Sequence, residues 1–134
     1  LIEPLGFRLG EKDIRRAGMD YWPQLDVTTY SNYEDFLRRN PDAEIYMATT
    51  KGAKVYSQVR FEPNCYLMFG KESGGIPEEL LLENQERAVR IPMLGDTRSL
   101  NLSNAAAIVL YEALRQNGFE QLSLEGRLTK YDWK

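Results

Sequence analysis

The amino-acid sequence predicts an α/β fold, and three features support that class. Short apolar segments of strand length alternate along the chain with segments of helical periodicity. Polar or glycine-rich loops follow three of these strands, at 49–52, 70–77 and 92–104. With 134 residues and 43% hydrophobic content, the chain has the size and composition of one globular domain with a single core. We therefore expect residues 1–134 to form one domain.

The N-terminal part is predicted to contain the end of a strand and two short helices. The segment "LIEPLGF" at 1–7 indicates the tail of a strand that begins outside this sequence. A short helix is expected over 11–17, with Gly18 as its end. Ser31 precedes Glu34 by three residues, which is the spacing of a capping box at the start of a second helix.

The central part is predicted to supply three strands and one helix. Strands are expected at 44–50, 65–70 and 88–92, and the second is so apolar that we expect it to be buried on both faces. Pro77 is expected at the first helical position of the intervening helix, because the N–H that proline lacks would have no partner there.

The last helix has the clearest periodicity. From Leu102 onward, apolar residues recur with the 3.6-residue period, and Gly118 is expected to end the helix. Five polar residues crowd around its start: Arg98, Ser99, Asn101, Ser103 and Asn104. Asn101 or Ser103 can cap the helix. Since buried polar groups require partners from the backbone or from a ligand, the remaining members of this cluster indicate a polar pocket at the helix N-terminus.

The three loops that follow strands are expected to meet, because ligands of open α/β sheets bind beyond the carboxyl ends of the strands. Gly70, Gly74 and Gly75 would let the backbone approach such a ligand closely. A tight turn into the next helix explains the same glycines equally simply.

The composition excludes several kinds of chemistry. Histidine is absent, which excludes Ser-His-Asp and Cys-His catalysis and the common zinc sites, and we expect no metal. Cys65 is the only cysteine, so a disulfide within the chain is impossible and a cytoplasmic location is expected. The net charge of −3 indicates no general affinity for polyanions, although local basic patches can still bind nucleic acid. Neither a membrane-spanning run nor a signal-peptide pattern is present.

Blocks along nearly the whole chain resemble the SPOUT superfamily of RNA methyltransferases. They run from "IEPLGF" and "RRAGMDYW" through "ATTKG" and "YLMFGKESGGIP" to "RIPM" and "RSLNLSNAAAIVLYEALRQ". The sequence is most similar to the small members, which methylate the wobble nucleotide of tRNA. This resemblance implies a mostly parallel sheet flanked by helices, a deep C-terminal trefoil knot, and S-adenosylmethionine as the cofactor.

The resemblance also implies which residues serve the reaction, the transfer of a methyl group to the ribose 2′-hydroxyl of a cytidine or modified uridine. The positions that match cofactor-contacting residues are Ala48, Gly70, Ile91, Ser99 and Leu100. Asn101 and Ser103 are expected to shape the methyl-transfer site. The main catalytic asparagine and arginine of the family belong to an N-terminal motif that we expect upstream of Leu1, together with a first strand and helix.

The partners implied by the resemblance are tRNA and a second copy of the chain. Family members are homodimers, and the last helix is the expected interface, with Tyr111 facing the partner, the tRNA or the core. The basic residues expected to contact tRNA are Arg8, Lys12, Arg15, Arg16 and Arg98. An ordinary solvated helix face would show the same pattern of charges.

Two alternatives remain open from the sequence. One is 2′-O-methylation at another site in tRNA or ribosomal RNA. The other is a non-catalytic module that binds S-adenosylmethionine or RNA without methyl transfer.

Overall fold

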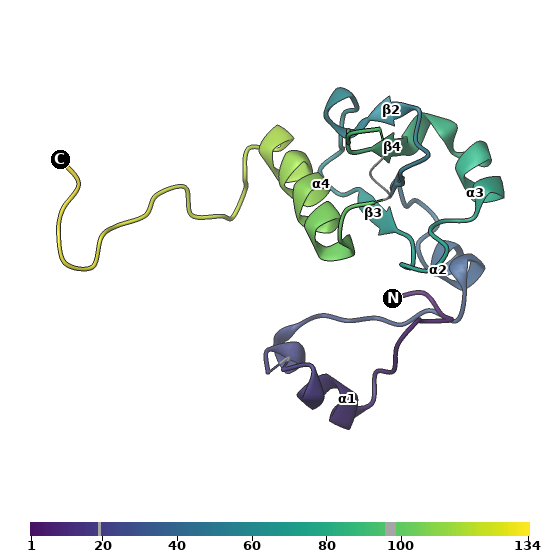
Figure 1. Cartoon of the computed structure of the whole chain (residues 1–134), viewed down its shortest axis with the longest axis horizontal. Helices are drawn as coiled ribbons and strands as arrows, with labels where there is room; N and C mark the ends of the chain where they lie inside the picture. Colours follow the sequence, from purple (N-terminus) through teal and green to yellow (C-terminus); the bar gives the residue numbers. More distant parts are fainter. Residues whose placement is uncertain (19, 96–98) are drawn as a thin grey trace.

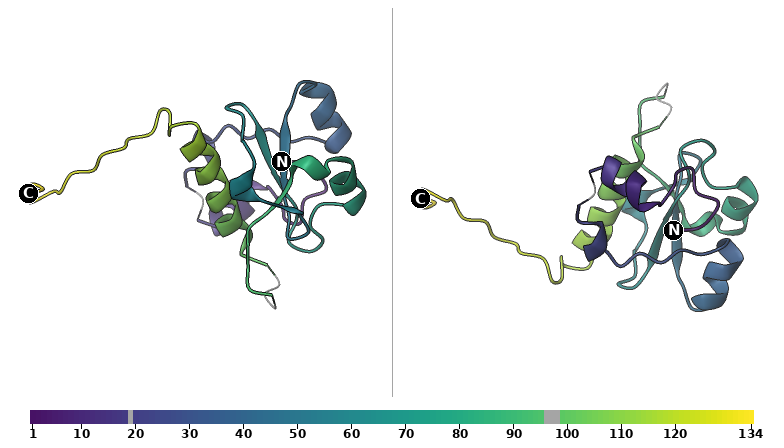
Figure 2. Two further views of the ribbon diagram at one scale, coloured as in Figure 1. Left: turned by 90° about the horizontal axis from the view of Figure 1, so that it is seen from above. Right: turned by 90° about the horizontal axis from the view of Figure 1, so that it is seen from below.

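The structure, a computed structural model, describes residues 1–18, 20–95 and 99–134. Its strands are β1 (Ile45–Ala48), β2 (Lys54–Val55), β3 (Tyr66–Phe69) and β4 (Ala88–Arg90). Its α-helices are α1 (Glu11–Arg16), α2 (Tyr33–Arg39), α3 (Glu78–Glu83) and α4 (Leu102–Gln116). The strands form one parallel sheet in the order β2-β4-β1-β3, with α4 on one face and α2 and α3 on the other (Figure 1, Figure 2). The predicted α/β class and mostly parallel sheet are confirmed.

Strand β1 lies inside the sheet and supplies both halves of the core. Successive side chains of a strand point to opposite faces. Accordingly, Ile45 and Met47 pack with the residues of α2 and α3, whereas Tyr46 packs against Phe61 and against Val109 of α4. The exposed fractions of Met47 and Val109 are 0% and 1%, so the sheet is covered well on both faces at this point.

One strand prediction needs correction, and one strand was missed. Segment 65–70 is predicted to be buried on both faces, but β3 lies at the edge of the sheet and the Tyr66 side chain is 40% exposed. The apolar composition of a strand indicates what covers its two faces, but it does not indicate whether another strand pairs with each of its edges. The position of β3 at the edge of the sheet could therefore not be predicted from its composition. Strand β2 is not predicted at all, because two residues carry no periodicity.

The predicted helices are all present, with shifts of one residue at two starts. Pro77 is predicted at the first helical position, but it has an extended ψ of 138° and is the N-cap of α3. Its carbonyl accepts the first helical bond, from the Leu81 N–H at 3.2 Å. Helix α4 begins at Leu102 and ends before Gly118, whose φ of +75° confirms the predicted glycine stop.

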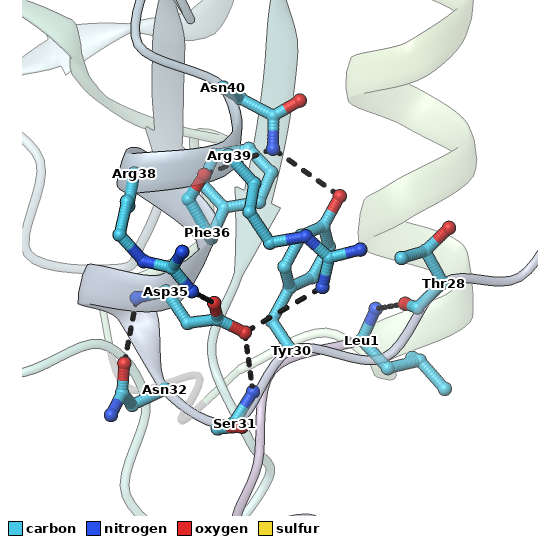
Figure 3. A network of polar contacts seen from close by, with 10 residues as sticks. All are labelled: Leu1, Thr28, Tyr30, Ser31, Asn32, Asp35, Phe36, Arg38, Arg39 and Asn40. Atoms are coloured by element: carbon cyan, nitrogen blue, oxygen red, sulfur yellow. Dashed lines mark hydrogen bonds and ion pairs between the residues drawn. The ribbon is translucent and has the colours of Figure 1, made fainter.

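The start of α2 uses a capping pair one residue later than expected. The predicted pair is Ser31 with Glu34, whereas the side chain of Asn32 accepts a bond from the Asp35 N–H at 2.7 Å. The Asp35 carboxylate in return accepts the Ser31 N–H at 3.1 Å (Figure 3). The sequence "SNYED" offers both pairs at the same spacing. Asparagine and serine have similar cap preferences, so only the folded backbone distinguishes the two pairs.

The N-terminal segment makes a single parallel bridge, Ile2 to Tyr30, and does not join the described sheet. Between these two residues the chain leaves the body in an excursion that carries α1, a helix with no buried residue (Figure 1). The last residues, from about 121, extend away from α4 without regular structure. No described helix is both long and apolar enough to span a membrane.

Candidate functional site

The carboxyl ends of three parallel strands meet around one cavity of about 580 Å³. The segments that border it follow β1, β3 and β4, and the fourth side is the start of α4. The prediction that the loops after these strands converge is confirmed. The lining residues are Ala48, Thr49, Thr50, Lys51, Phe69, Gly70, Lys71, Glu72, Ser73, Gly74, Gly75, Ile76, Ile91, Met93, Ser99, Leu100, Asn101, Leu102 and Ala105.

All five residues expected to contact the cofactor line this cavity, although they come from three separate loops. Ala48 is the last residue of β1, Gly70 follows β3, Ile91 follows β4, and Ser99 and Leu100 precede α4. The cavity therefore has both apolar side chains and loop backbone in its wall, which is the usual composition of a small-molecule site.

Gly70 is required by packing. A Cβ atom at this position would lie 2.3 Å from the carbonyl carbon of Gly75, which is closer than any real contact. The loop folds back on itself here, because the Gly75 N–H donates to the Lys71 carbonyl at 2.8 Å and Gly75 has a φ of +67°. Gly70 also lines the cavity, so its main chain forms part of the wall.

Asn101 caps α4 and also lines the cavity. Its Oδ1 accepts the Ser103 N–H at 3.0 Å and the Ser103 hydroxyl at 2.5 Å. Ser103 is outside the cavity wall, so its side chain reaches the site only through Asn101. Of the two residues expected at the methyl-transfer site, the structure places Asn101 in the cavity and Ser103 behind it.

The charged residues of the wall come from the loops after β1 and β3. Lys51, Lys71 and Glu72 line the cavity, and the Lys51 ammonium is paired with the Glu78 carboxylate in the first turn of α3. This contact lowers the pKa of Glu78 below its usual value, chiefly through the hydrogen bond from Lys51. Lys51 is not among the predicted site residues. Its position directly after the predicted strand 44–50 could have indicated that it lies at the site.

The basic residues expected to bind RNA lie apart from the cavity wall. Arg8, Lys12, Arg15 and Arg16 are exposed on or beside α1, where Arg15 pairs with Glu11 at 2.6 Å. Arg98 lies outside the described residues.

Cys65 is half-buried beside Tyr46 and Phe61, and this burial raises the pKa of its thiol. A raised thiol pKa disfavours the thiolate, so Cys65 is a packing residue rather than a nucleophile. Within the described ranges, no group of three or more cysteine, aspartate or glutamate side chains is arranged to hold a metal ion.

Fold and site together define an α/β protein with a ligand cavity at the carboxyl ends of its parallel strands. Residues 1–111 match the SpoU rRNA methylase family, and the chain belongs to this family. The predicted resemblance is confirmed.

Curated relatives match over most of the chain. A Listeria innocua protein is 45% identical over 128 residues, covering 93% of this chain and 76% of the relative. The tRNA (cytidine(34)-2′-O)-methyltransferase of Saccharophagus degradans is 44% identical over 120 residues, covering 89% and 78%. The enzyme of the same name from Escherichia coli K12 is 43% identical over 120 residues, covering 89% and 76%.

Solved structures agree with the sequence relatives. A Bacillus anthracis crystal structure has a TM-score of 0.84 and 42% identity, covering 94% of this chain and 81% of that one. A structure described as giving insights into 2′-OH methylation of C/U34 on tRNA has a TM-score of 0.79 and 39% identity, covering 90% and 78%. The AdoMet-bound rRNA methyltransferase of Sinorhizobium meliloti has a TM-score of 0.65 and 31% identity, covering 81% and 40%.

Proposed function

We propose that this protein uses S-adenosylmethionine to methylate the ribose 2′-hydroxyl of the wobble nucleotide of tRNA, a cytidine or a modified uridine. The observation that carries the proposal is the cavity, because the five positions matched to cofactor contacts come from separate loops and all line it. Relatives that carry the name tRNA (cytidine(34)-2′-O)-methyltransferase align over about nine-tenths of the chain and support the choice of nucleotide.

The cavity fits this cofactor in size and in chemistry. Its volume of about 580 Å³ lies within the range of about 300–1,000 Å³ that is typical of small-molecule sites. Ala48, Ile91 and Leu100 supply apolar walls for a flat ring, and the main chain of Gly70 in the wall supplies N–H and C=O groups. When bound, the cofactor supplies a methyl group activated by a positively charged sulfur.

The contribution of the described residues to the reaction is to position the ribose hydroxyl. Because the Asn101 oxygen accepts both bonds from Ser103, the amide NH₂ is the part of this side chain that can donate to the ribose oxygen. Ser103 is then a positioning residue that acts through Asn101. Correct alignment of reacting groups can lower a barrier by about 7–11 kcal/mol. The principal catalytic asparagine and arginine are still expected in the N-terminal motif of the family.

We also propose the trefoil knot, the homodimer and the cytoplasmic location that the resemblance implies. A knot requires the segments after β1, β3 and β4 to lie together, and described residues of all three line one cavity. The exposed apolar residues Ile108 and Leu110 on α4 support an interface on that helix. The proposed tRNA substrate supports the cytoplasmic location.

The RNA surface that we propose includes the basic side chains of the α1 excursion. Replacing Arg15 and Arg16 together by alanine should weaken tRNA binding and reduce its salt dependence, by a slope of about 0.7–0.9 for each phosphate that is no longer neutralised. Filter binding at several salt concentrations measures both quantities. The matched control replaces Arg127 and Lys130, two exposed cations of the C-terminal tail, and an equal effect there would contradict the assignment.

The proposed function is tested by binding and then by transfer. Calorimetric titration with S-adenosylmethionine and S-adenosylhomocysteine should give one ligand per chain. Incubation with S-adenosylmethionine and a tRNA that lacks the wobble modification should then give methylation of nucleotide 34 of the tRNA. Binding without transfer to any tRNA would contradict the enzymatic assignment, and transfer to another nucleotide would contradict the wobble position.

A further inference from the structure

An ion pair beside the cavity joins two segments that are distant in sequence. Lys51 lies in the turn after β1 and lines the cavity. Its ammonium group bonds to Oε1 of Glu78, 27 residues further along the chain. Glu78 follows directly on the glycine-rich loop 70–77. The pair therefore connects the first cavity loop to the far end of the second.

The backbone at Lys51 is anchored on the sheet. The Lys51 N–H donates to the Thr49 hydroxyl at 3.2 Å, and the Gly52 N–H donates to the Thr49 carbonyl at 3.3 Å. A Cβ atom on Gly52 would lie 2.7 Å from the carbonyl carbon of Val89, so this turn packs directly against β4. Lys51 thus extends from a fixed base toward the second loop.

The second loop is closed by backbone bonds within itself. The N–H groups of Gly74 and Gly75 both donate to the Lys71 carbonyl, at 3.4 and 2.8 Å. Ile76, with 4% exposure, fixes the end of the loop in the core. Between Gly70 and Ile76 the side chains are exposed, and such segments open locally at a small free-energy cost.

We propose that Lys51 and Glu78 form a positioning pair that holds loop 70–77 against the turn after β1 and so keeps the cavity in its binding shape. Naming S-adenosylmethionine as the ligand rests on the proposed function, whereas the restraint on the loop does not. The side chains are 54% and 72% exposed, and exposed pairs contribute little to global stability. The effect is therefore expected in the loop and not in the unfolding of the whole domain.

The chain offers a matched control on the same sheet. Lys54 of β2 pairs with Glu86, and these side chains are 42% and 77% exposed. This second pair has the same chemistry and also bridges distant segments, but neither residue lines the cavity. Removing it should change nothing at loop 70–77.

The first measurement is amide hydrogen exchange of loop 70–77. Lys51→Met and Glu78→Gln should each speed exchange at Gly74 and Gly75 by about 1.5- to 5-fold, the factor that corresponds to about 0.2–1 kcal/mol for an exposed ion pair. The exchanged pair Lys51→Glu with Glu78→Lys should restore most of the protection. Salt of about 1 M, where the Debye length is about 3 Å, should bring the unaltered protein toward the variants. Lys54→Met and Glu86→Gln should leave these amides unchanged.

The second measurement is affinity for S-adenosylhomocysteine by calorimetry. Lys51→Met and Glu78→Gln should weaken binding by similar factors, and Lys51→Arg should retain most of the affinity. If Lys51→Met alone weakened binding, Lys51 would contact the ligand directly and the positioning role would be wrong. Unchanged exchange in both variants would overturn the proposal outright. If the unaltered chain bound no ligand, the proposed function would be wrong. The hydrogen-exchange experiment would still show whether Lys51 and Glu78 hold loop 70–77 in place.

Discussion

Gly70 shows at the scale of one residue how the cavity depends on the absence of a side chain. The loop after β3 returns so closely that an added Cβ would overlap the backbone of Gly75. Neighbouring Gly74 is different, because its nearest obstacle is the flexible Cε of Lys71 at 3.3 Å. The two glycines look alike in the sequence and are distinguished only by the fold.

Gly70→Ala should therefore destabilise the protein, whereas Gly74→Ala should not. Overpacking a close contact typically costs about 1–3 kcal/mol, and we expect a loss of this size together with weaker ligand binding. Denaturant unfolding and calorimetry measure the two effects. Equal stability of both variants would mean that the close approach at Gly70 is wrong.

Asn101 is expected to have two separable roles, as a helix cap and as a donor in the cavity. Asn101→Ala removes both and should cost about 0.5–2 kcal/mol in unfolding free energy as well as activity. Asn101→Asp keeps an acceptor oxygen for the Ser103 N–H but loses the NH₂ group. This variant should retain the stability and lose methyl transfer. Full transfer by Asn101→Asp would show that the NH₂ group has no part in the reaction.

Among the elements, α4 is tied to the rest of the molecule at its C-terminal end. The Gln116 side chain donates to the Val59 carbonyl at 3.0 Å and accepts the Phe61 N–H at 2.9 Å. Glu112 in turn accepts bonds from Gln116 and Arg115, each at 2.9 Å, and so orients Gln116. Because α4 also begins at the cavity, these bonds at its C-terminal end help to hold the cavity end of the helix in position.

The anchor predicts a particular acid sensitivity. The bonds from Arg115 and Gln116 lower the pKa of Glu112 from 4.5 to about 2. A carboxyl group whose pKa is lower in the folded protein stabilises it fully above the unfolded value, and this contribution is lost as the pH falls toward 2. Urea unfolding between pH 6 and pH 2 should show this loss, and Glu112→Gln should reduce it. Glu120→Gln, which removes an exposed carboxylate outside this network, is the control for the loss of one carboxylate.

The whole molecule presents an apolar surface on the outer side of α4. Leu110 and Tyr111 are 46% and 57% exposed, although the opposite side of the helix buries Val109 and Ala113 in the core. A helix with one side in the core and exposed apolar residues on the other is typical of an interface. This arrangement supports the proposed homodimer.

Tyr111→Arg should shift the chain from dimer to monomer, because a charge at an apolar interface loses hydration without a partner. Sedimentation measures the association, and the melting temperature of the unaltered chain should rise with protein concentration. Lys130→Glu, on the exposed tail, is the control for a change of charge alone. A monomer at every concentration, with no effect of Tyr111→Arg, would contradict the dimer.

The sequence by itself determined the class of fold and most of the elements. Apolar runs, helix caps, helix-ending residues and the periodicity of the last helix predicted β1, β3, β4 and all four α-helices to within a few residues, because these signals act within each segment. The loops after the strands were predicted to form the site because the carboxyl ends of parallel strands lie at one edge of the sheet. The choice of individual site residues such as Ala48 and Ile91 came from the resemblance, as no local pattern marks them.

Only the tertiary structure decided which residues meet. It placed β3 at an edge, selected Asn32 over Ser31 as the cap, and put Ser103 behind Asn101. It also paired Lys51 with Glu78 across 27 residues of chain. The order of strands in a sheet, the choice between two equivalent caps and an ion pair between distant residues all depend on how segments pack in space. The sequence pattern of a segment indicates only which of its own faces is buried, so it cannot predict these contacts.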